Sequence, residues 1–278
     1  MIKVIEPGLY SSIQDHGRFG YRNIGVPYSG FMDHESAGIA NKIVGNNESE
    51  PLIEITIMGP TLLFNNDCVL SITGGDFNSL INNSKIEMYK PLHVKLGDTL
   101  KINHTKSGAR CYLAFSGGVD IKSILGSKSS FKGITSSYFL KKGDEIKIIS
   151  NNKSNFNFDC KSVFNIENIL NVSKGPEFNM LKKDSLDILF NKKFTIGVNN
   201  RMAYNLNEKL QVASKSIVSS PVLPGTVQLT PSGNIIVLHR DCQVSGGYGR
   251  ILQLDEKSLN YLSQLKTGQI VKFKLISK

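Results

Sequence analysis

The feature that most constrains the fold is a series of short strand-like segments, separated by turns, that recurs along the 278 residues. In residues 52–58, isoleucines alternate with polar residues, and the pair Gly59-Pro60 ends the run. Period-two runs with frequent turn signals are typical of a β-barrel or a β-sandwich. Further strands of the first half are expected at 61–64, 68–75, 93–102, 109–118 and 144–150.

Both halves of the chain contain such short strand-like segments separated by turns. This pattern predicts a mainly β protein of two related domains. Residues 151–159 are polar, rich in asparagine and without periodicity, and they are the best candidate for a linker. We therefore expect one domain at 1–150 and another at 160–278. A small hydroxyl residue followed by two glycines recurs in SITGGD, AFSGGVD and QVSGGYGR. Tight hairpins and bulges explain most of these copies.

A few short helices interrupt the strands. The clearest is expected at 34–44, with Asp33 as its N-cap and Gly45 as the left-handed residue after its end. Asn41 borders the apolar face of this helix, so its amide needs partners, which the preceding glycine-rich loop could supply. The spacing of leucines predicts two more helices, at 178–190 and 257–265.

Composition excludes several classes of protein. The net charge is +10, but the lysines are scattered and are not interleaved with aromatic residues, so nucleic acid is not an expected partner. No apolar run approaches the roughly 18 residues of a membrane span, and the N-terminus lacks the core of a signal peptide. The four cysteines are dispersed and are expected to be reduced and structural, which indicates a cytoplasmic protein.

Polar residues gather in two clusters in which chemistry is expected. The first lies at 14–33, within the glycine-rich stretch 14–46, and the second lies at 241–250; a weaker cluster lies at 199–206, around Arg201. Asp15 and Asp241 are candidate general bases, because each lies close in sequence to arginine and glycine. Arg18 and Arg201 are candidate anion clamps, although a structural ion pair is the simpler explanation for each arginine taken singly.

Several familiar chemistries are excluded. In LGSKSS a serine separates Gly126 from Lys128, so the segment is not a Walker A phosphate loop. The five histidines lack the spacing of metal ligands, and no metal is expected. No G-x-S-x-G elbow is present, and no Met-Lys-Met to which biotin could be attached.

A family resemblance is carried by blocks that follow one another along nearly the whole chain: QDHGRFGYRNIGVPYSGFMDHESAGIANKIVGN, LIEITIMGP, YLAFSGGVD with LGSKSS, NRMAYNL, PGTVQL and DCQVSGGYGR. In this order they resemble the C subunit of bacterial ATP-dependent 5-oxoprolinase, a family also described as allophanate hydrolase subunit 2 or biotin-dependent carboxyltransferase domain. The resemblance implies two tandem cyclophilin-like β-barrel domains.

The resemblance also implies a function. The chain is expected to form a complex with the B subunit of 5-oxoprolinase and to bind the A subunit transiently. This complex would hydrolyse 5-oxo-L-proline to L-glutamate, with ATP and Mg²⁺ as co-substrate. The chain is not expected to be active alone. Two alternatives stay open. One is a regulatory module that binds an inhibitor of a histidine kinase; this inhibitor would resemble the B subunit. The other is a component of a urea- or allophanate-type carboxyltransferase.

The coincidence of polar clusters and family blocks defines the expected site. Catalysis is expected at Asp15, Arg18, Asp241 and Gln243. Substrate binding is expected at Gln14, Tyr21, Ser29, Lys128, Arg201, Tyr204, Gln228, Gly246, Gly247 and Tyr248. We hypothesise that the two clusters line one pocket between the domains. The chain departs from the family pattern at Lys128 and Asn205, where the family has arginine.

Overall fold

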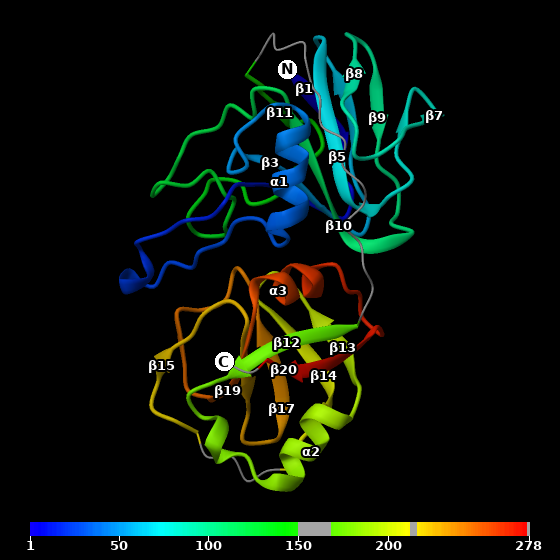
Figure 1. The fold of residues 1–278 in the computed structure, drawn as a ribbon. Coiled ribbons are helices and arrows are strands. Elements are labelled where there is room, and N and C mark those ends of the chain that lie inside the picture. Colours follow the sequence, from blue (N-terminus) through cyan, green and yellow to red (C-terminus); the bar gives the residue numbers. More distant parts are fainter. Residues whose placement is uncertain (150–167, 212–215, 277–278) are drawn as a thin grey trace. The chain divides into compact units, whose positions relative to one another are not determined.

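The structure is a computed structural model that describes residues 1–149, 168–211 and 216–276. The described chain is mainly β, as predicted, and its three α-helices are short. The expected linker at 151–159 lies outside the described residues. Contacts divide the chain into two compact units (Figure 1), made of Met1–Phe19 with Ser29–Phe164 and of Gly20–Tyr28 with Asn165–Lys278.

The first unit contains two antiparallel sheets. The six-stranded sheet has the order β11 (Glu145–Ile146), β1 (Ile2–Glu6), β4 (Thr61–Phe64), β9 (Thr99–Lys101), β6 (Leu80–Ile81), β7 (Ser84–Lys85). The five-stranded sheet has the order β2 (Tyr10–Gln14), β3 (Leu52–Thr56), β10 (Ser107–Phe115), β5 (Cys68–Asp76), β8 (Leu92–Val94). The expected strand at 93–102 is therefore two strands in different sheets. The turn between them contains Gly97 at φ +89°.

Strand β3 shows why the five-stranded sheet is buried on both faces. Ile53 and Ile55 point into the core that the two sheets share, whereas Leu52 belongs to a second cluster with helix α1 (His34–Ile43). Successive strand residues point to opposite faces, so one strand serves both clusters. Helix α1 is further tied to β5, because Thr73 Oγ1 donates to the Ser36 carbonyl at 2.6 Å.

The caps predicted for α1 are confirmed. The Asp33 carboxylate accepts hydrogen bonds from the Ser36 backbone N–H at 3.1 Å and from its hydroxyl at 2.6 Å. Gly45 has φ +71°, the left-handed conformation that glycine adopts without strain. The partners predicted for Asn41 are wrong: its amide donates to the carbonyls of Glu48 and Glu50, because the turn after the helix folds back over it.

The second unit is a closed barrel of seven strands. Their order is β12 (Ile169–Lys174), β19 (Gly249–Leu254), β16 (Thr226–Leu229), β17 (Asn234–Leu238), β14 (Ala203–Lys209), β13 (Phe194–Asn199), β20 (Ile270–Leu275). Helix α3 (Glu256–Ser263) is close to its prediction, whereas the predicted helix 178–190 is a 3₁₀ turn, Phe178–Met180, followed by α2 (Lys183–Asn191). A two-stranded ribbon, β15 (Ser220–Pro221) with β18 (Ser245–Gly246), completes the described strands.

The segment Gly20–Tyr28 belongs to the second unit although it comes from the N-terminal part of the sequence. It includes the 3₁₀ turn Arg22–Ile24. The Arg22 guanidinium lies 4.7 Å from the centre of the Tyr28 ring, and it donates to the backbone carbonyls of Val222 and Val244. By these contacts, the second unit includes a short segment that precedes most of the first unit in sequence.

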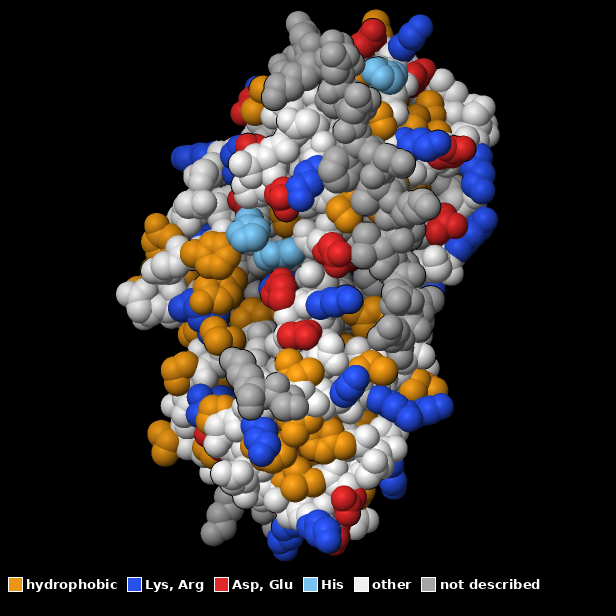
Figure 2. All heavy atoms as spheres, viewed as in Figure 1, with side chains coloured by type: hydrophobic (Ala, Val, Ile, Leu, Met, Phe, Trp, Pro, Cys, Tyr) orange, Lys and Arg blue, Asp and Glu red, His pale blue; other side chains and the backbone are white. Residues whose placement is uncertain are grey.

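The excess positive charge is dispersed on the surface. On the face shown in Figure 2, Lys and Arg side chains are spread over the molecule and are not gathered in one patch. Scattered charges of this kind are typical of a solvated surface. Within residues 1–149, 168–211 and 216–276, no helix has the length and apolar character that crossing a membrane requires.

Candidate functional site

Asp15 lies at the centre of a hydrogen-bonded cluster in the first unit. Its carboxylate accepts hydrogen bonds from the hydroxyls of Ser127 (2.7 Å) and Ser129 (2.5 Å) and from the backbone N–H groups of Gly17 (2.9 Å) and Lys128 (2.5 Å). Only 8% of the residue is exposed. The Asp15 carboxylate is thus the common acceptor of four donors from two segments of the chain. It therefore ties the loop 124–130 to the glycine-rich stretch.

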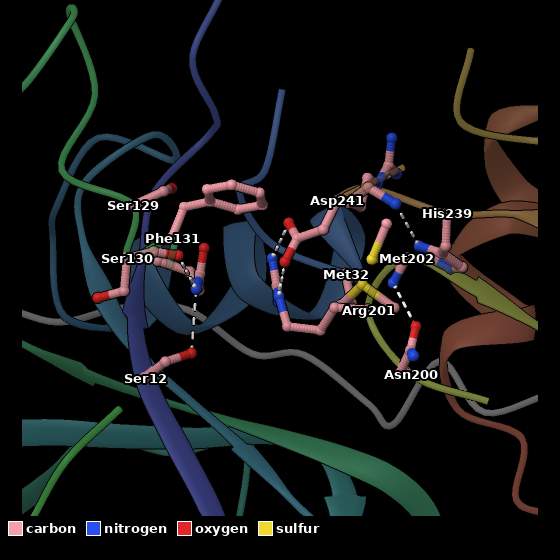
Figure 3. A network of polar contacts seen from close by, with 12 residues as sticks. Ser12, Met32, Ser129, Ser130, Phe131, Asn200, Arg201, Met202, His239 and Asp241 are labelled. Carbon is pink, nitrogen blue, oxygen red and sulfur yellow. Dashed lines mark hydrogen bonds and ion pairs between the residues drawn. The ribbon is translucent and has the colours of Figure 1, made fainter. Parts of the chain in front are cut away.

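Gln14 and Arg18 also bind the segment 124–130. Arg18 is fully buried, and it donates to the carbonyls of Ile124 (3.1 Å) and Ser129 (2.9 Å). Gln14 donates to the Ser12 hydroxyl and to the Ser130 carbonyl. Ser12 and Ser130 are labelled on the left of Figure 3. These bonds go to neutral backbone and hydroxyl oxygens, which is the pattern of a structural support.

The remaining predicted residues of this stretch differ in their surroundings. Lys128 is half-buried, and its backbone N–H is bonded to Asp15. Ser29 is buried with φ +55°, and its hydroxyl has no hydrogen-bond partner among the described residues. A non-glycine residue in this conformation costs about 1–3 kcal/mol and is a feature of strained or functional loops. Tyr21 is half-buried in the second unit.

Arg201 and Asp241 form a buried, two-point ion pair in the second unit (Figure 3). Arg201 Nε and Nη2 lie 2.8 and 3.0 Å from the two carboxylate oxygens, and the Asp241 N–H donates to the Arg201 carbonyl. The two side chains are 8% and 10% exposed. The explanation favoured for a single arginine, a structural ion pair, therefore applies to Arg201. The same contact occupies both oxygens of Asp241.

Tyr204 is also placed by packing. It is fully buried in β14, and its hydroxyl donates to the Ser263 carbonyl at 3.3 Å. Its ring lies 5.5 Å from that of His239, which is likewise fully buried. This position favours support of the barrel interior over direct contact with a ligand.

The predicted residues Gln228, Gln243, Gly246, Gly247 and Tyr248 surround the β15–β18 ribbon. Gln228 is 1% exposed, whereas Gln243 and Tyr248 are exposed and the two glycines are half-buried. The structure therefore brings some of the predicted residues together around Asp15 and others around the ribbon, and it places Arg201, Asp241 and Tyr204 in separate contacts. That these clusters form one pocket stays a prediction.

Sequence reasoning missed two arginines of the second unit. Arg22 bonds the carbonyls next to both strands of the ribbon, which lie 200 and 222 positions away in sequence. Arg250 makes a two-point contact with Glu177, at 2.8 Å from each oxygen. This hydrogen bond holds the pKa of Glu177 below its ordinary range. Neither partner could be assigned without the fold, because no local motif links the residues.

The described cysteines Cys68, Cys111 and Cys242 are free thiols, in agreement with the reduced cysteines expected from sequence. Burial raises the pKa of the Cys242 thiol to about 11, although the nearby Arg22 partly offsets this effect. Burial likewise raises the pKa of Cys68 to about 12. Thiolate is the reactive form, so neither residue has the character of a nucleophile at neutral pH.

These pKa values predict a loss of stability in alkali. From pH 9 to 11 the Cys242 thiol ionises in the unfolded chain, with an ordinary pKa of 9.0, but stays protonated in the folded chain. The unfolded state then binds fewer protons, so the free energy of unfolding falls by up to about 1.4 kcal/mol per pH unit. Replacement of Cys242 by alanine should flatten this fall in urea titrations at pH 8, 9, 10 and 11. An unchanged slope would contradict the assigned pKa.

Among the described residues, no group of three or more His, Cys, Asp or Glu side chains is placed to hold a metal ion. In the loop 126–130, the Lys128 N–H is bonded to Asp15 and so is not free to bind a phosphate. The described site is thus built from amides, hydroxyls, arginines and carboxylates.

The model of the family described as carboxyltransferase domain, subdomain A and B, matches residues 24–275. The chain belongs to this family. It is 30% identical to the C subunit of 5-oxoprolinase of Escherichia coli (strain K12) over 98% of this chain and 90% of that protein. It is 42% identical to urea amidolyase of Saccharomyces cerevisiae over 57% of this chain and 9% of that protein.

A solved structure of the same fold is the Kluyveromyces lactis urea carboxylase. It superposes with a TM-score of 0.90 at 28% identity, over 99% of this chain and 27% of that chain. The carboxyltransferase-domain protein described here therefore spans about a quarter of that enzyme, but nearly the whole length of the Escherichia coli protein. The family expected from the sequence motifs is confirmed.

Proposed function

We propose that this carboxyltransferase-domain protein is the C subunit of an ATP-dependent 5-oxoprolinase, which opens the lactam of 5-oxo-L-proline to give L-glutamate. The similarity to the Escherichia coli protein over 98% of this chain and 90% of that protein carries the proposal. The fungal enzymes, in contrast, contain the same region as a small part of a longer chain.

The proposed complex includes the B subunit as a stable partner and the A subunit as a transient one. ATP with Mg²⁺ is a co-substrate of the complex, and no biotin is attached to this chain. Because the Lys128 amide is bonded to Asp15, the loop 126–130 is not the proposed site for the nucleotide phosphates. The role proposed for this chain is to bind and orient the lactam.

Reconstitution tests the proposal. The chain is mixed with the B and A subunits, ATP, Mg²⁺ and 5-oxoproline, and released glutamate is measured. Glutamate should appear in the complete mixture and be absent when this chain is left out. Release at the same rate without this chain would reject the proposal. Size-exclusion chromatography of the chain with the B subunit checks separately that the stable complex forms.

A second candidate function is favoured by the family model and by the fungal relatives. The chain would then take part in carboxyl transfer from a biotinylated carrier, as the description of the family model suggests. Turnover would depend on bicarbonate and on the biotinylated carrier, and avidin would inhibit it. The regulatory role towards a kinase inhibitor stays a prediction from the resemblance.

A further inference from the structure

The first unit contains a cavity of about 400 Å³, and none of the described residues that line it belongs to the site expected from the sequence. Cavities that bind small molecules usually measure roughly 300–1,000 Å³. Two half-buried side chains, Ile121 and Phe139, line it together with part of the core that the two sheets share. The lining residues from this core are Ile13, Val119, Leu140 and Ile146. The cavity is therefore large enough for a small molecule and apolar at its base.

The cavity lies where the edges of the two sheets do not join. Strand β2 is at the edge of the five-stranded sheet, and β11 is at the edge of the six-stranded sheet. The chain between β10 and β11 follows each edge in turn. Next to β11, the Asp120 N–H donates to the Lys147 carbonyl at 2.8 Å. Next to β2, the Leu140 N–H donates to the Ser11 carbonyl at 2.7 Å. Backbone hydrogen bonds thus fix two sides of the cavity, as is usual in a preformed binding site.

The exposed residues of the cavity carry charges of both signs. The side chains of Asp120, Glu145 and Lys147 are exposed, and within residues 1–149, 168–211 and 216–276 none of them has an ion-pair partner. The Asp144 carboxylate differs, because it accepts a hydrogen bond from the Lys141 N–H at 2.8 Å. Both signs are therefore available beside an apolar base. A molecule with two opposite charges at one end and an apolar group at the other complements this arrangement.

We propose that this cavity binds a free α-amino acid with an apolar side chain, for example leucine or phenylalanine. Lys141 and Lys147 pair with the carboxylate of the ligand, Asp120 pairs with its ammonium group, and its side chain lies on the core residues at the base. Removal of this side chain from water supplies most of the affinity, whereas exposed ion pairs add little and mainly select the zwitterion. Glutamate, the product in the proposed function, has a charged side chain and is not the expected ligand.

The direct test is NMR spectroscopy of the full chain labelled at isoleucine δ1-methyl groups, alone and with the B subunit. Ile13, Ile121 and Ile146 line the cavity, and each signal is identified by its absence in the corresponding valine variant. Saturable shifts of these three signals are expected with L-leucine, and none with glycine. The signal of Ile236, in β17 of the second unit, should not move. No shift with leucine or phenylalanine, in both samples, would overturn the proposal.

A series of ligands separates the apolar base from the charges. Leucine should bind at least about tenfold more tightly than alanine, because each additional buried CH₂ group strengthens binding. Leucine should also bind more tightly than 3-methylbutylamine, which lacks the carboxylate, and than 4-methylpentanoate, which lacks the amine. Equal affinities of leucine and alanine would exclude an apolar base. Equal affinities of leucine and either analogue would exclude recognition of the zwitterion, and the proposal would fail.

Variants test the lysines. Replacement of both Lys141 and Lys147 by glutamine should weaken the binding of leucine by about tenfold, because two exposed ion pairs are lost. It should not weaken the binding of 3-methylbutylamine. The matched control replaces Lys122 and Lys142, two exposed lysines that do not line the cavity, by glutamine and should leave both affinities unchanged. All four side chains are exposed, so neither double variant should lower the melting temperature.

Two results would count against the site. If the Lys141 and Lys147 double variant binds leucine as tightly as the wild type, the proposal fails. If the control double variant weakens binding equally, the effect is one of net charge, and the proposal fails as well. The measurements use binding and not turnover, so this site and the 5-oxoprolinase assignment can be rejected separately.

Discussion

Replacement of Asp241 by alanine is expected to lower the free energy of unfolding of the second unit by about 3–5 kcal/mol. The change removes the Asp241 carboxylate from the guanidinium of Arg201, whose side chain is 8% exposed. Arginine cannot lose its proton at accessible pH, so the charge stays, and the ion pair that offsets part of its desolvation is lost. Urea denaturation followed by circular dichroism measures the effect.

Two further variants make this result interpretable. Asp187→Ala removes an exposed carboxylate from α2 in the same unit and should change stability by no more than about 0.5 kcal/mol. The double variant Arg201→Met with Asp241→Leu replaces the pair by apolar groups and should recover much of the loss. If Asp241→Ala had the same free energy of unfolding as Asp187→Ala, the buried ion pair would not contribute to stability as predicted.

Replacement of Asp15 by alanine is expected to detach the loop 124–130 in the first unit. Four donors lose their common acceptor, among them the buried hydroxyl of Ser129 and the Lys128 N–H. Hydrogen bonds to a charged group contribute about 1.5–3 kcal/mol each when removed singly, and these four act together, so a loss of at least about 3 kcal/mol follows. Hydrogen exchange of a peptide covering 122–132 reports on the loop directly.

The Lys128 amide should exchange slowly in the wild type and much faster in Asp15→Ala. Asp76→Ala is a suitable control, because Asp76 is an exposed carboxylate in the same unit, and its side chain accepts a hydrogen bond from the nearby Asn78 N–H. It should leave exchange at 122–132 unchanged. Equal protection of this peptide in wild type and Asp15→Ala would show that Asp15 does not organise the loop.

These two predictions change how loss of activity is interpreted. Asp15 and Asp241 are candidate general bases by sequence, yet both carboxylates are bonded within their own units. Loss of turnover in an alanine variant is therefore expected from structural disruption alone. A catalytic role requires that turnover falls in a variant whose stability and hydrogen exchange match those of the wild type.

The sequence is most informative where the controlling interactions are local. Asp33 and Gly45 delimit α1 through contacts within one turn, and both are predictable from the residues alone. Period-two runs likewise predict the mainly β fold. The expected single strand at 93–102 is wrong because the turn at Gly97 sends its two ends into different sheets.

Partners distant in sequence cannot be predicted in the same way. The serine donors to Asp15 lie 112 and 114 positions away, and the carbonyls bound by Arg22 lie still further along the chain. Composition indicates that these residues are polar and close to glycine, but it cannot indicate what they bind. The cavity beside β2 and β11 is likewise visible only once both sheets of the first unit are in place.

Conversion of ¹³C-labelled 5-oxoproline, followed by NMR in a mixture of this chain, the B and A subunits, ATP and Mg²⁺, is the decisive measurement for the 5-oxoprolinase assignment. We expect labelled glutamate to form only when this chain is present, and we expect avidin and the removal of bicarbonate to leave its rate unchanged. Unchanged 5-oxoproline in the complete mixture, or turnover that requires bicarbonate and is blocked by avidin, would contradict the assignment.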